Sequence, residues 1–160
     1  MDMLIPIAER IAAKLKARGE KVSVAESSSG GLISAALLAV PGASAYFISG
    51  AVVYTPKARA TLMDIPKEAL AGMRSASEPY ALLLAQTACA RFGTDWGLSE
   101  TGAAGPTGNP YGDAAGHSCV GLAGPGTEIA LTVETGQADR ALNMREFARE
   151  ALSLLERALA

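Results

Sequence analysis

The hydrophobic pattern of this chain changes period several times, and this limits the folds open to it. Residues 4–18 carry apolar side chains at helical spacing, and Gly19 follows where a helix would end. Residues 21–26 then read as a short strand, residues 31–40 as a largely buried helix, and residues 45–55 as a second strand rich in β-branched and aromatic side chains. Helices and strands that alternate in this way predict a layered α/β sheet.

The second half of the chain continues the alternation. Ser77 is expected to cap a helix that ends at Gly93, and residues 95–100 form the third predicted strand. Residues 117–124 and 127–135 are predicted to pair as a hairpin. With helices before, between and after the strands, both faces of the sheet should be covered. The last predicted helix begins at its cap, Asp139, and turns inward an apolar stripe made of Met144, Phe147, Ala151, Leu154 and Leu155.

Length and charge narrow the possible functions. The 160 residues suit a single domain over residues 1–160, and no repeat or linker divides them. A net charge of -2 argues against nucleic-acid binding driven by phosphate neutralisation. The apolar runs are interrupted before they reach the roughly 18 residues of a spanning helix. We therefore expect a protein that has no membrane partner.

The N-terminal segment and the cysteines suggest a reduced compartment. Residues 1–19 lack the early positive charges and the cleavage site of a signal peptide, so a cytoplasmic protein is expected. Cys89 and Cys119 are 30 positions apart, without a CxxC motif or a Cys/His cluster. They are interpreted as buried thiols, and neither a metal site nor a cofactor is predicted.

Polar side chains follow the first predicted strand. Glu26 is succeeded by three serines, Ser27, Ser28 and Ser29, and by two glycines, Gly30 and Gly31. One serine is enough to cap a helix. Hydroxyls, free amides and glycines at a helix start also form a cradle for phosphate. The pattern alone leaves capping and phosphate binding open, but the GxxxxGK[ST] and GxGxxG motifs are absent.

A glycine- and proline-rich loop, residues 101–116, follows the third strand, and loops of this length in compact domains are often functional. Ligands of α/β sheets bind at the carboxyl ends of strands, so this loop and the serine cluster are expected to share one crevice. Glu26 and Glu100 both end strands there. They either pair with arginines that brace the site or act as acids or bases.

Few residues could serve as a base or bind an anion. His117 is the only histidine, and a lone histidine is more often structural. A serine nucleophile could instead use an amine with a lowered pKa, for which Lys57 is the natural choice. Arg59 is a poor base because its guanidinium stays protonated. Arg140, in the first turn of the last helix, is either solvated or placed to meet a ligand anion.

Five segments bring a known family into view. The sequences AESSSGG, VPGASAYFISGAVVYT, SASEP, ETGAAGP and ADR occur in this order and spacing. They resemble the CinA C-terminal domain family, whose usual forms are AESCTGG, PGSSAWF, VTYS, AVSEP and SGIAGP. The resemblance covers roughly residues 5–157. It implies a three-layer α/β/α sandwich with a mixed sheet, often assembled as a homo-oligomer.

The resemblance also implies an activity. The best-described family members are nicotinamide-nucleotide amidases, which hydrolyse nicotinamide mononucleotide to nicotinate mononucleotide and ammonia by a serine-lysine mechanism without a metal. Ser44 matches a serine of the PGSS segment and is the first choice of nucleophile; Ser27 is the second, or a hydrogen-bonding partner. Tyr54 matches the VTYS tyrosine. The other residues implied to contact substrate are Glu26, Ser28, Ser29, Gly30, Gly31, Thr101, Gly102, Gly105, His117 and Arg140.

One departure from the family bears on catalysis. Where the family pattern YSNEAK ends in lysine, this chain has Arg59. The first hypothesis is an active amidohydrolase in which Lys57 or His117 replaces the missing base and amides near Gly102 stabilise the oxyanion. The alternative is a catalytically degenerate nucleotide- or phosphate-binding module in which Arg59 grips an anion. Hydrolysis of another small amide or phosphorylated compound is the third possibility.

Overall fold

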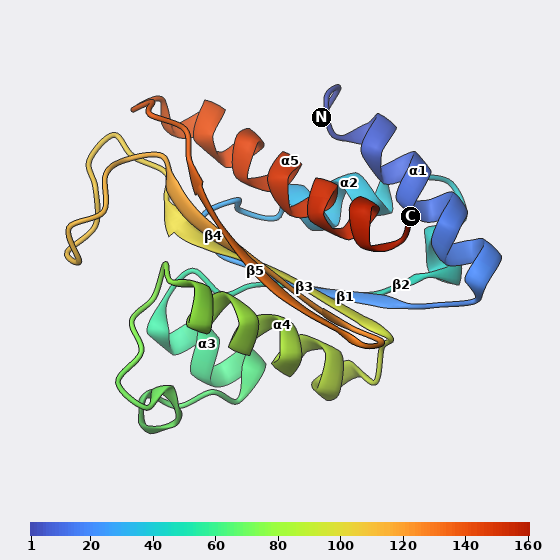
Figure 1. The fold of residues 1–160 in the computed structure, drawn as a ribbon, viewed down its shortest axis with the longest axis horizontal. Helices are drawn as coiled ribbons and strands as arrows, with labels where there is room; N and C mark the ends of the chain where they lie inside the picture. The colour runs from blue at the N-terminus through green and yellow to red at the C-terminus, as the bar shows by residue number, and fades with distance from the viewer.

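A five-stranded mixed sheet lies between two layers of helices in the computed structural model, which describes residues 1–160 (Figure 1). The strand order is β2-β1-β3-β4-β5. β1 runs parallel to both β2 and β3, whereas β3, β4 and β5 are joined antiparallel. The predicted α/β/α sandwich with a mixed sheet is therefore confirmed. The strands are β1 Val22–Glu26, β2 Phe47–Val52, β3 Trp96–Ala103, β4 His117–Gly124 and β5 Thr127–Glu134.

The helices divide between the two faces of the sheet. α1, α2 and α5 cover one face, and α3 and α4 cover the other (Figure 1). No helix is both long enough and apolar enough to cross a membrane. The helices are α1 Ile5–Arg18, α2 Leu32–Leu38, α3 Pro56–Met63, α4 Glu78–Phe92 and α5 Arg140–Ala158, with short 3₁₀ turns at Ala43–Ala45 and Lys67–Leu70.

The helix ends follow from local chemistry. Gly19 ends α1 with a positive φ of 65°, a conformation that costs glycine little. Ser77 accepts a hydrogen bond from the Tyr80 amide at the start of α4, and Asp139 does the same for Leu142 in α5. Both caps were predicted from the sequence. These caps fix where α4 and α5 begin beside the carboxyl ends of the parallel strands.

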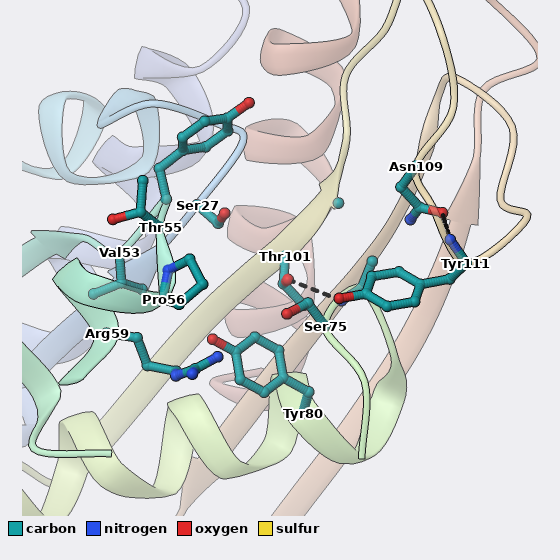
Figure 2. A pocket seen from close by; sticks show the side chains of 13 residues that line it. Ser27, Val53, Thr55, Pro56, Arg59, Ser75, Tyr80, Thr101, Asn109 and Tyr111 are labelled. Atoms are coloured by element: carbon teal, nitrogen blue, oxygen red, sulfur yellow. Dashed lines mark hydrogen bonds between the residues drawn. The ribbon is translucent and has the colours of Figure 1, made fainter. Parts of the chain in front are cut away.

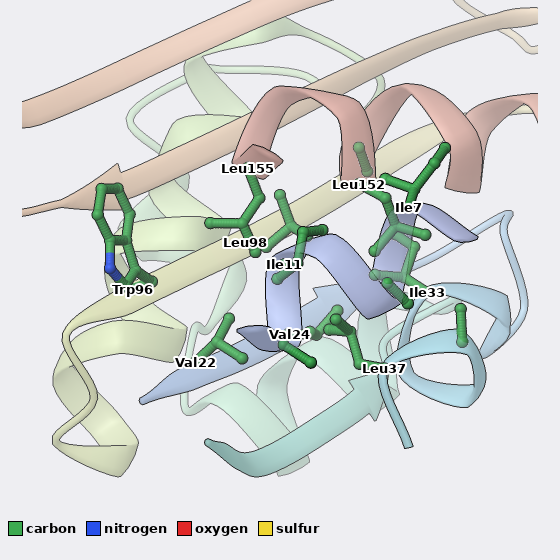
Figure 3. Close-up of a cluster of buried hydrophobic side chains, with 14 of the residues drawn as sticks. Ile7, Ile11, Val22, Val24, Ile33, Leu37, Trp96, Leu98, Leu152 and Leu155 are labelled. Atoms are coloured by element: carbon green, nitrogen blue, oxygen red, sulfur yellow. The ribbon is translucent and has the colours of Figure 1, made fainter. Parts of the chain in front are cut away.

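Most of the core lies between the sheet and α1, α2 and α5. This larger cluster holds 24 buried residues, against 7 in the cluster under α3 and α4, so the first face supplies most of the hydrophobic stabilisation. Figure 3 shows strand residues Val22, Val24 and Leu98 packed among helix residues such as Ile11 and Leu152. The first cavity described below opens beside α3 and α4.

Two expectations about the elements need correction. β3 runs three residues past the predicted end because Thr101–Ala103 pair with β4, so the irregular loop begins only after them. In α5, Met144 is only half-buried, whereas Asn143 is fully buried. The Asn143 amide donates to the carbonyls of Ala104 and Gln137 at 2.8 and 2.9 Å, which satisfies it inside the protein and ties α5 to the loop after β3.

Candidate functional site

The parallel strands place their carboxyl ends around one crevice. β1 lies between β2 and β3. The chain passes from β1 to β2 through α2 on one face of the sheet and from β2 to β3 through α3 and α4 on the other face, an arrangement at which α/β proteins bind ligands. The serine segment follows β1, and Val53–Pro56 follows β2. The end of β3 contributes Thr101 and Gly102. The expected meeting of the serine cluster with the end of the third strand is thus found.

Glu26 holds the start of α2 from inside the protein. Its carboxylate is fully buried and accepts five hydrogen bonds. Three come from the backbone amides of Gly31, Ile33 and Ser34 at 2.9, 3.2 and 2.9 Å. The hydroxyls of Ser29 and Ser34 donate the other two, both at 2.7 Å. A negative group at a helix start is favoured by the free amides and by the helix dipole.

Glu100 binds the serine segment from the neighbouring strand. It is also fully buried and accepts from the Ser27 and Ser29 amides at 3.1 and 2.8 Å and from the Ser28 and Ser118 hydroxyls at 2.5 and 2.8 Å. Burial raises the pKa of Glu100, and these hydrogen bonds oppose the shift by stabilising the ionised form. Both carboxylates therefore brace the segment, and their partners are hydroxyls and amides in place of the arginines considered above.

These contacts correct the predicted phosphate cradle. The amides that begin α2 are occupied by Glu26, and the hydroxyls of Ser28 and Ser29 are buried against the two carboxylates. None of these serines faces a cavity. Gly30 and Gly31 turn the chain with positive φ angles of 67° and 98°, so their role is conformational. Binding of substrate by this part of the cluster is not what the structure shows.

Ser27 differs from its neighbours. Its hydroxyl makes no hydrogen bond within the protein, and the half-buried side chain lines a cavity of about 230 Å³ (Figure 2). The cavity is closed by residues from all three strand ends and from the segments before α4 and β4. These are Val53, Tyr54, Thr55, Pro56, Arg59, Ser75, Ala76, Tyr80, Thr101, Gly102, Asn109 and Tyr111.

Arg59 brings a buried positive charge into this cavity. The residue is 5% exposed, and its Nε donates to the Ile65 carbonyl at 3.3 Å. Its guanidinium lies beside the hydroxyl of Tyr80 (Figure 2), with Cζ 5.9 Å from the ring centre. Burial raises the pKa of the Tyr80 phenol, and the nearby charge of Arg59 opposes this shift.

A second cavity, of about 270 Å³, adjoins the first. Tyr54, Gly102 and Asn109 line both, and Gly105 and Arg140 line the second. The Arg140 guanidinium donates to the Gly105 carbonyl at 2.5 Å and to the Tyr54 hydroxyl at 3.2 Å. The predicted pocket residues Tyr54, Gly102, Gly105 and Arg140 therefore lie together, and Thr101 joins them in the first cavity.

Two predicted catalytic residues lie elsewhere. Ser44 is exposed in the turn before β2, so it lies at the amino end of the parallel strands, whereas Ser27 follows β1 at the carboxyl end. Lys57 is exposed in the first turn of α3 and lines neither cavity. Helical geometry turns it away from Arg59, two positions on. Neither Ser44 nor Lys57 therefore lies beside Ser27 within this chain.

His117 is a structural residue. Its Nε2 lies 2.8 Å from the Ala76 carbonyl and its Nδ1 2.5 Å from the Glu134 carboxylate, and it lines neither cavity. Burial lowers the pKa of His117, but the hydrogen bonds to Glu134 and Ala76 and the charge of Asp113 outweigh it, so the pKa is raised. Both ring nitrogens are therefore engaged within the protein, away from the two cavities.

Contacts that were not predicted from the sequence support the outer wall of the first cavity. Arg74 donates to both oxygens of Asp113 at 2.6 and 3.2 Å, and its guanidinium lies 5.3 Å from the ring centre of Tyr111. Asn109 also donates to Asp113, at 2.8 Å. The arginine hydrogen bond lowers the pKa of Asp113. Asp113 thus ties the loop after β3 to the segment before α4, a pairing that no local pattern predicts.

The structure contains no group of three or more His, Cys, Asp and Glu side chains arranged to hold a metal.

The amino-acid sequence is similar to those of known proteins. A CinA-like protein of Anaeromyxobacter sp. (strain K) is 41% identical over 152 residues, which is 94% of this chain and 37% of that protein. A CinA-like protein of Chloroherpeton thalassium is 35% identical over 158 residues, or 97% of this chain and 38% of that protein. The chain thus spans under two fifths of the length of these curated relatives.

Solved structures agree with the sequence comparison. A competence-damaged protein (CinA) superfamily protein from Klebsiella pneumoniae 700603 matches with a TM-score of 0.90 at 26% identity, over 98% of this chain and 97% of that one. The competence/damage inducible protein CihA from Agrobacterium tumefaciens matches with a TM-score of 0.89 at 29% identity, over 98% and 95%. The CinA C-terminal domain profile matches residues 4–159. The chain therefore belongs to the CinA C-terminal domain family.

Proposed function

We propose that this protein is a CinA-type amidohydrolase that converts nicotinamide mononucleotide to nicotinate mononucleotide and ammonia, with Ser27 as the nucleophile. One observation carries the proposal: within the serine cluster, only the Ser27 hydroxyl is free of protein partners and faces a cavity. Glu100 accepts a hydrogen bond from the Ser27 amide, which anchors the backbone of the proposed nucleophile just after β1.

The two adjoining cavities suit the two ends of this substrate. The pyridine ring and its carboxamide would occupy the first cavity, beside Ser27 and the aromatic side chains. The phosphate would lie in the second, where Arg140 carries an exposed positive charge and is held by Gly105 and Tyr54. This layout moves phosphate recognition from the serine cluster to the start of α5.

In the proposed reaction, the Ser27 oxygen attacks the carboxamide carbon. The carbonyl electrons move to the oxygen, where the charge of Arg59 favours the oxyanion. Collapse of this intermediate breaks the carbon-nitrogen bond, ammonia leaves with the proton of the serine, and water then hydrolyses the serine ester to the carboxylate. The titratable groups lining the cavity besides Arg59 are Tyr54, Tyr80 and Tyr111, so the serine proton passes through a phenol oxygen or water.

The test is release of ammonia and nicotinate mononucleotide from nicotinamide mononucleotide by the purified protein. Ser27→Ala should abolish turnover, whereas Ser44→Ala, at the opposite end of the strands, should retain it. Turnover that survives in Ser27→Ala would refute the assignment of the nucleophile. Binding of the nucleotide without any turnover would instead identify a nucleotide-binding module.

A further inference from the structure

The charge of Arg59 has no counter-charge in the protein. Of the ion pairs in the structure, none includes Arg59, although the residue is 95% buried. Its partners are the Ile65 carbonyl and the Tyr80 ring, which are neutral. Arginine does not lose its proton in proteins, and an unpaired buried charge is unfavourable. Such a group is a strong attractor for an anionic ligand.

The position of Arg59 limits where that anion binds. Arg59 lines the cavity of Ser27 and also a neighbouring cavity of about 640 Å³ that contains Lys67 and Arg74. No aspartate or glutamate lines either cavity. Arg74 is neutralised by Asp113, and Lys67 is exposed. Arg59 is therefore the one buried, uncompensated cation on the walls that surround Ser27.

A planar guanidinium suits one kind of anion near a reacting serine. Its fork of N–H donors matches both oxygens of a carboxylate, which a lysine ammonium does not do. Deamidation at Ser27 produces a carboxylate in the same cavity, whereas the substrate amide is neutral and offers one acceptor oxygen. We infer that Arg59 makes this cavity a carboxylate site, so that the protein binds the acid product of its reaction, a pyridine carboxylate, more tightly than the amide substrate.

This inference rests on the proposed function for its choice of ligand, but its test does not require turnover. Affinities of nicotinate mononucleotide and nicotinamide mononucleotide are measured by isothermal titration calorimetry on the Ser27→Ala protein, which cannot convert one into the other. The acid should bind about tenfold or more tightly than the amide. Equal affinities would overturn the inference and leave the nucleophile assignment intact.

Arg59→Gln then separates the possible contacts. It should weaken binding of the acid by about tenfold and binding of the amide by much less. Lys57→Gln removes an exposed positive charge from the same helix and should change neither affinity, which controls for long-range electrostatics. If Arg59→Gln weakens acid and amide equally, Arg59 contacts the phosphate that both share, and the carboxylate site is disproved.

A measurement on the protein without any change at position 59 guards against misfolding of the variant. In a thermal melt, free nicotinate should raise the melting temperature of the Ser27→Ala protein, and nicotinamide at the same concentration should raise it less. Equal shifts from nicotinate and nicotinamide would contradict the inference, because they would show a site without preference for a carboxylate.

Discussion

Replacing Glu26 by glutamine tests whether the serine segment is held by a buried carboxylate. Glutamine has the same shape, but one of its two terminal atoms is an NH₂ donor. In one orientation this group faces the amides of Gly31 and Ile33, and in the other it faces the amide of Ser34. Backbone amides cannot reverse their direction, so at least one buried donor loses its acceptor in either orientation.

The magnitude follows from this count. One buried backbone amide without an acceptor costs about 1–3 kcal/mol. The remaining hydrogen bonds also weaken, because their acceptor is neutral and no longer charged. The smaller desolvation cost of the glutamine side chain offsets part of this loss. The free energy of unfolding of Glu26→Gln should therefore fall by about 2–4 kcal/mol. Urea titration followed by far-UV circular dichroism at neutral pH measures it. Glu128→Gln is the matched control, because the exposed Glu128 accepts one hydrogen bond, from Gln86.

A loss below about 0.5 kcal/mol, the range of ordinary surface substitutions, would refute the reasoning. A second variant should show a gain in anion binding. Glu26→Ala removes the carboxylate altogether and frees the amides at the start of α2. Sulfate should then stabilise Glu26→Ala more than it stabilises the wild type, because helix-start amides bind oxyanions. Equal stabilisation of both proteins would mean that these amides do not form an anion site.

Two further predictions concern the charged groups around the pocket. Arg59→Lys should raise the rate of deamidation at neutral pH, because a buried lysine can lose its proton and accept that of Ser27. The rate is measured by release of ammonia and of the acid product, and a fall to background in both assays would disprove the prediction. The raised pKa of His117 means that its contribution to stability is fully present below the unfolded pKa and is lost as pH rises through the folded pKa. The stability difference between wild type and His117→Gln should accordingly be larger at pH 6 than at pH 9. Because the chain has one histidine, its ring-proton NMR signal reports that titration directly, and a midpoint below about 6.5 would contradict the sign.

The elements and their caps could be predicted because they depend on short-range signals. The apolar periodicity, the Ser77 and Asp139 caps and Gly19 each act within one turn of helix. The longer β3 could not be predicted this way, since residues 101–103 become a strand only by pairing with β4. Local sequence patterns thus define the helices and strands, whereas pairing with residues distant in the sequence determines where a strand ends.

The candidate site was predicted only in part, for a related reason. The sequence placed Ser27, Tyr54, Thr101 and Gly102 near one crevice, but it did not show that Glu100 reaches across from β3 to occupy Ser28. Which serine stays free is decided by that tertiary contact.

The distance of Ser44 from the cavities follows from strand direction. In a parallel pair of strands, a residue that precedes one strand and a residue that follows the other lie at opposite ends of the pair. Ser44 precedes β2 and Ser27 follows β1, so within one chain the two hydroxyls lie at opposite ends of these strands. Motif resemblance identified both serines, and strand direction separates them.

The carboxylate of Glu26 acts on the amides of α2 as a tethered competitor. It is part of the same chain, five residues from the Gly31 amide, and needs no diffusion to reach them. Tethering of this kind gives an effective concentration on the order of millimolar or higher, and here the tether is a rigid strand. Free phosphate is therefore outcompeted at the start of α2, whatever its concentration in solution. The amides at the start of α2 are thus bound by the protein's own carboxylate and are not open to an external anion.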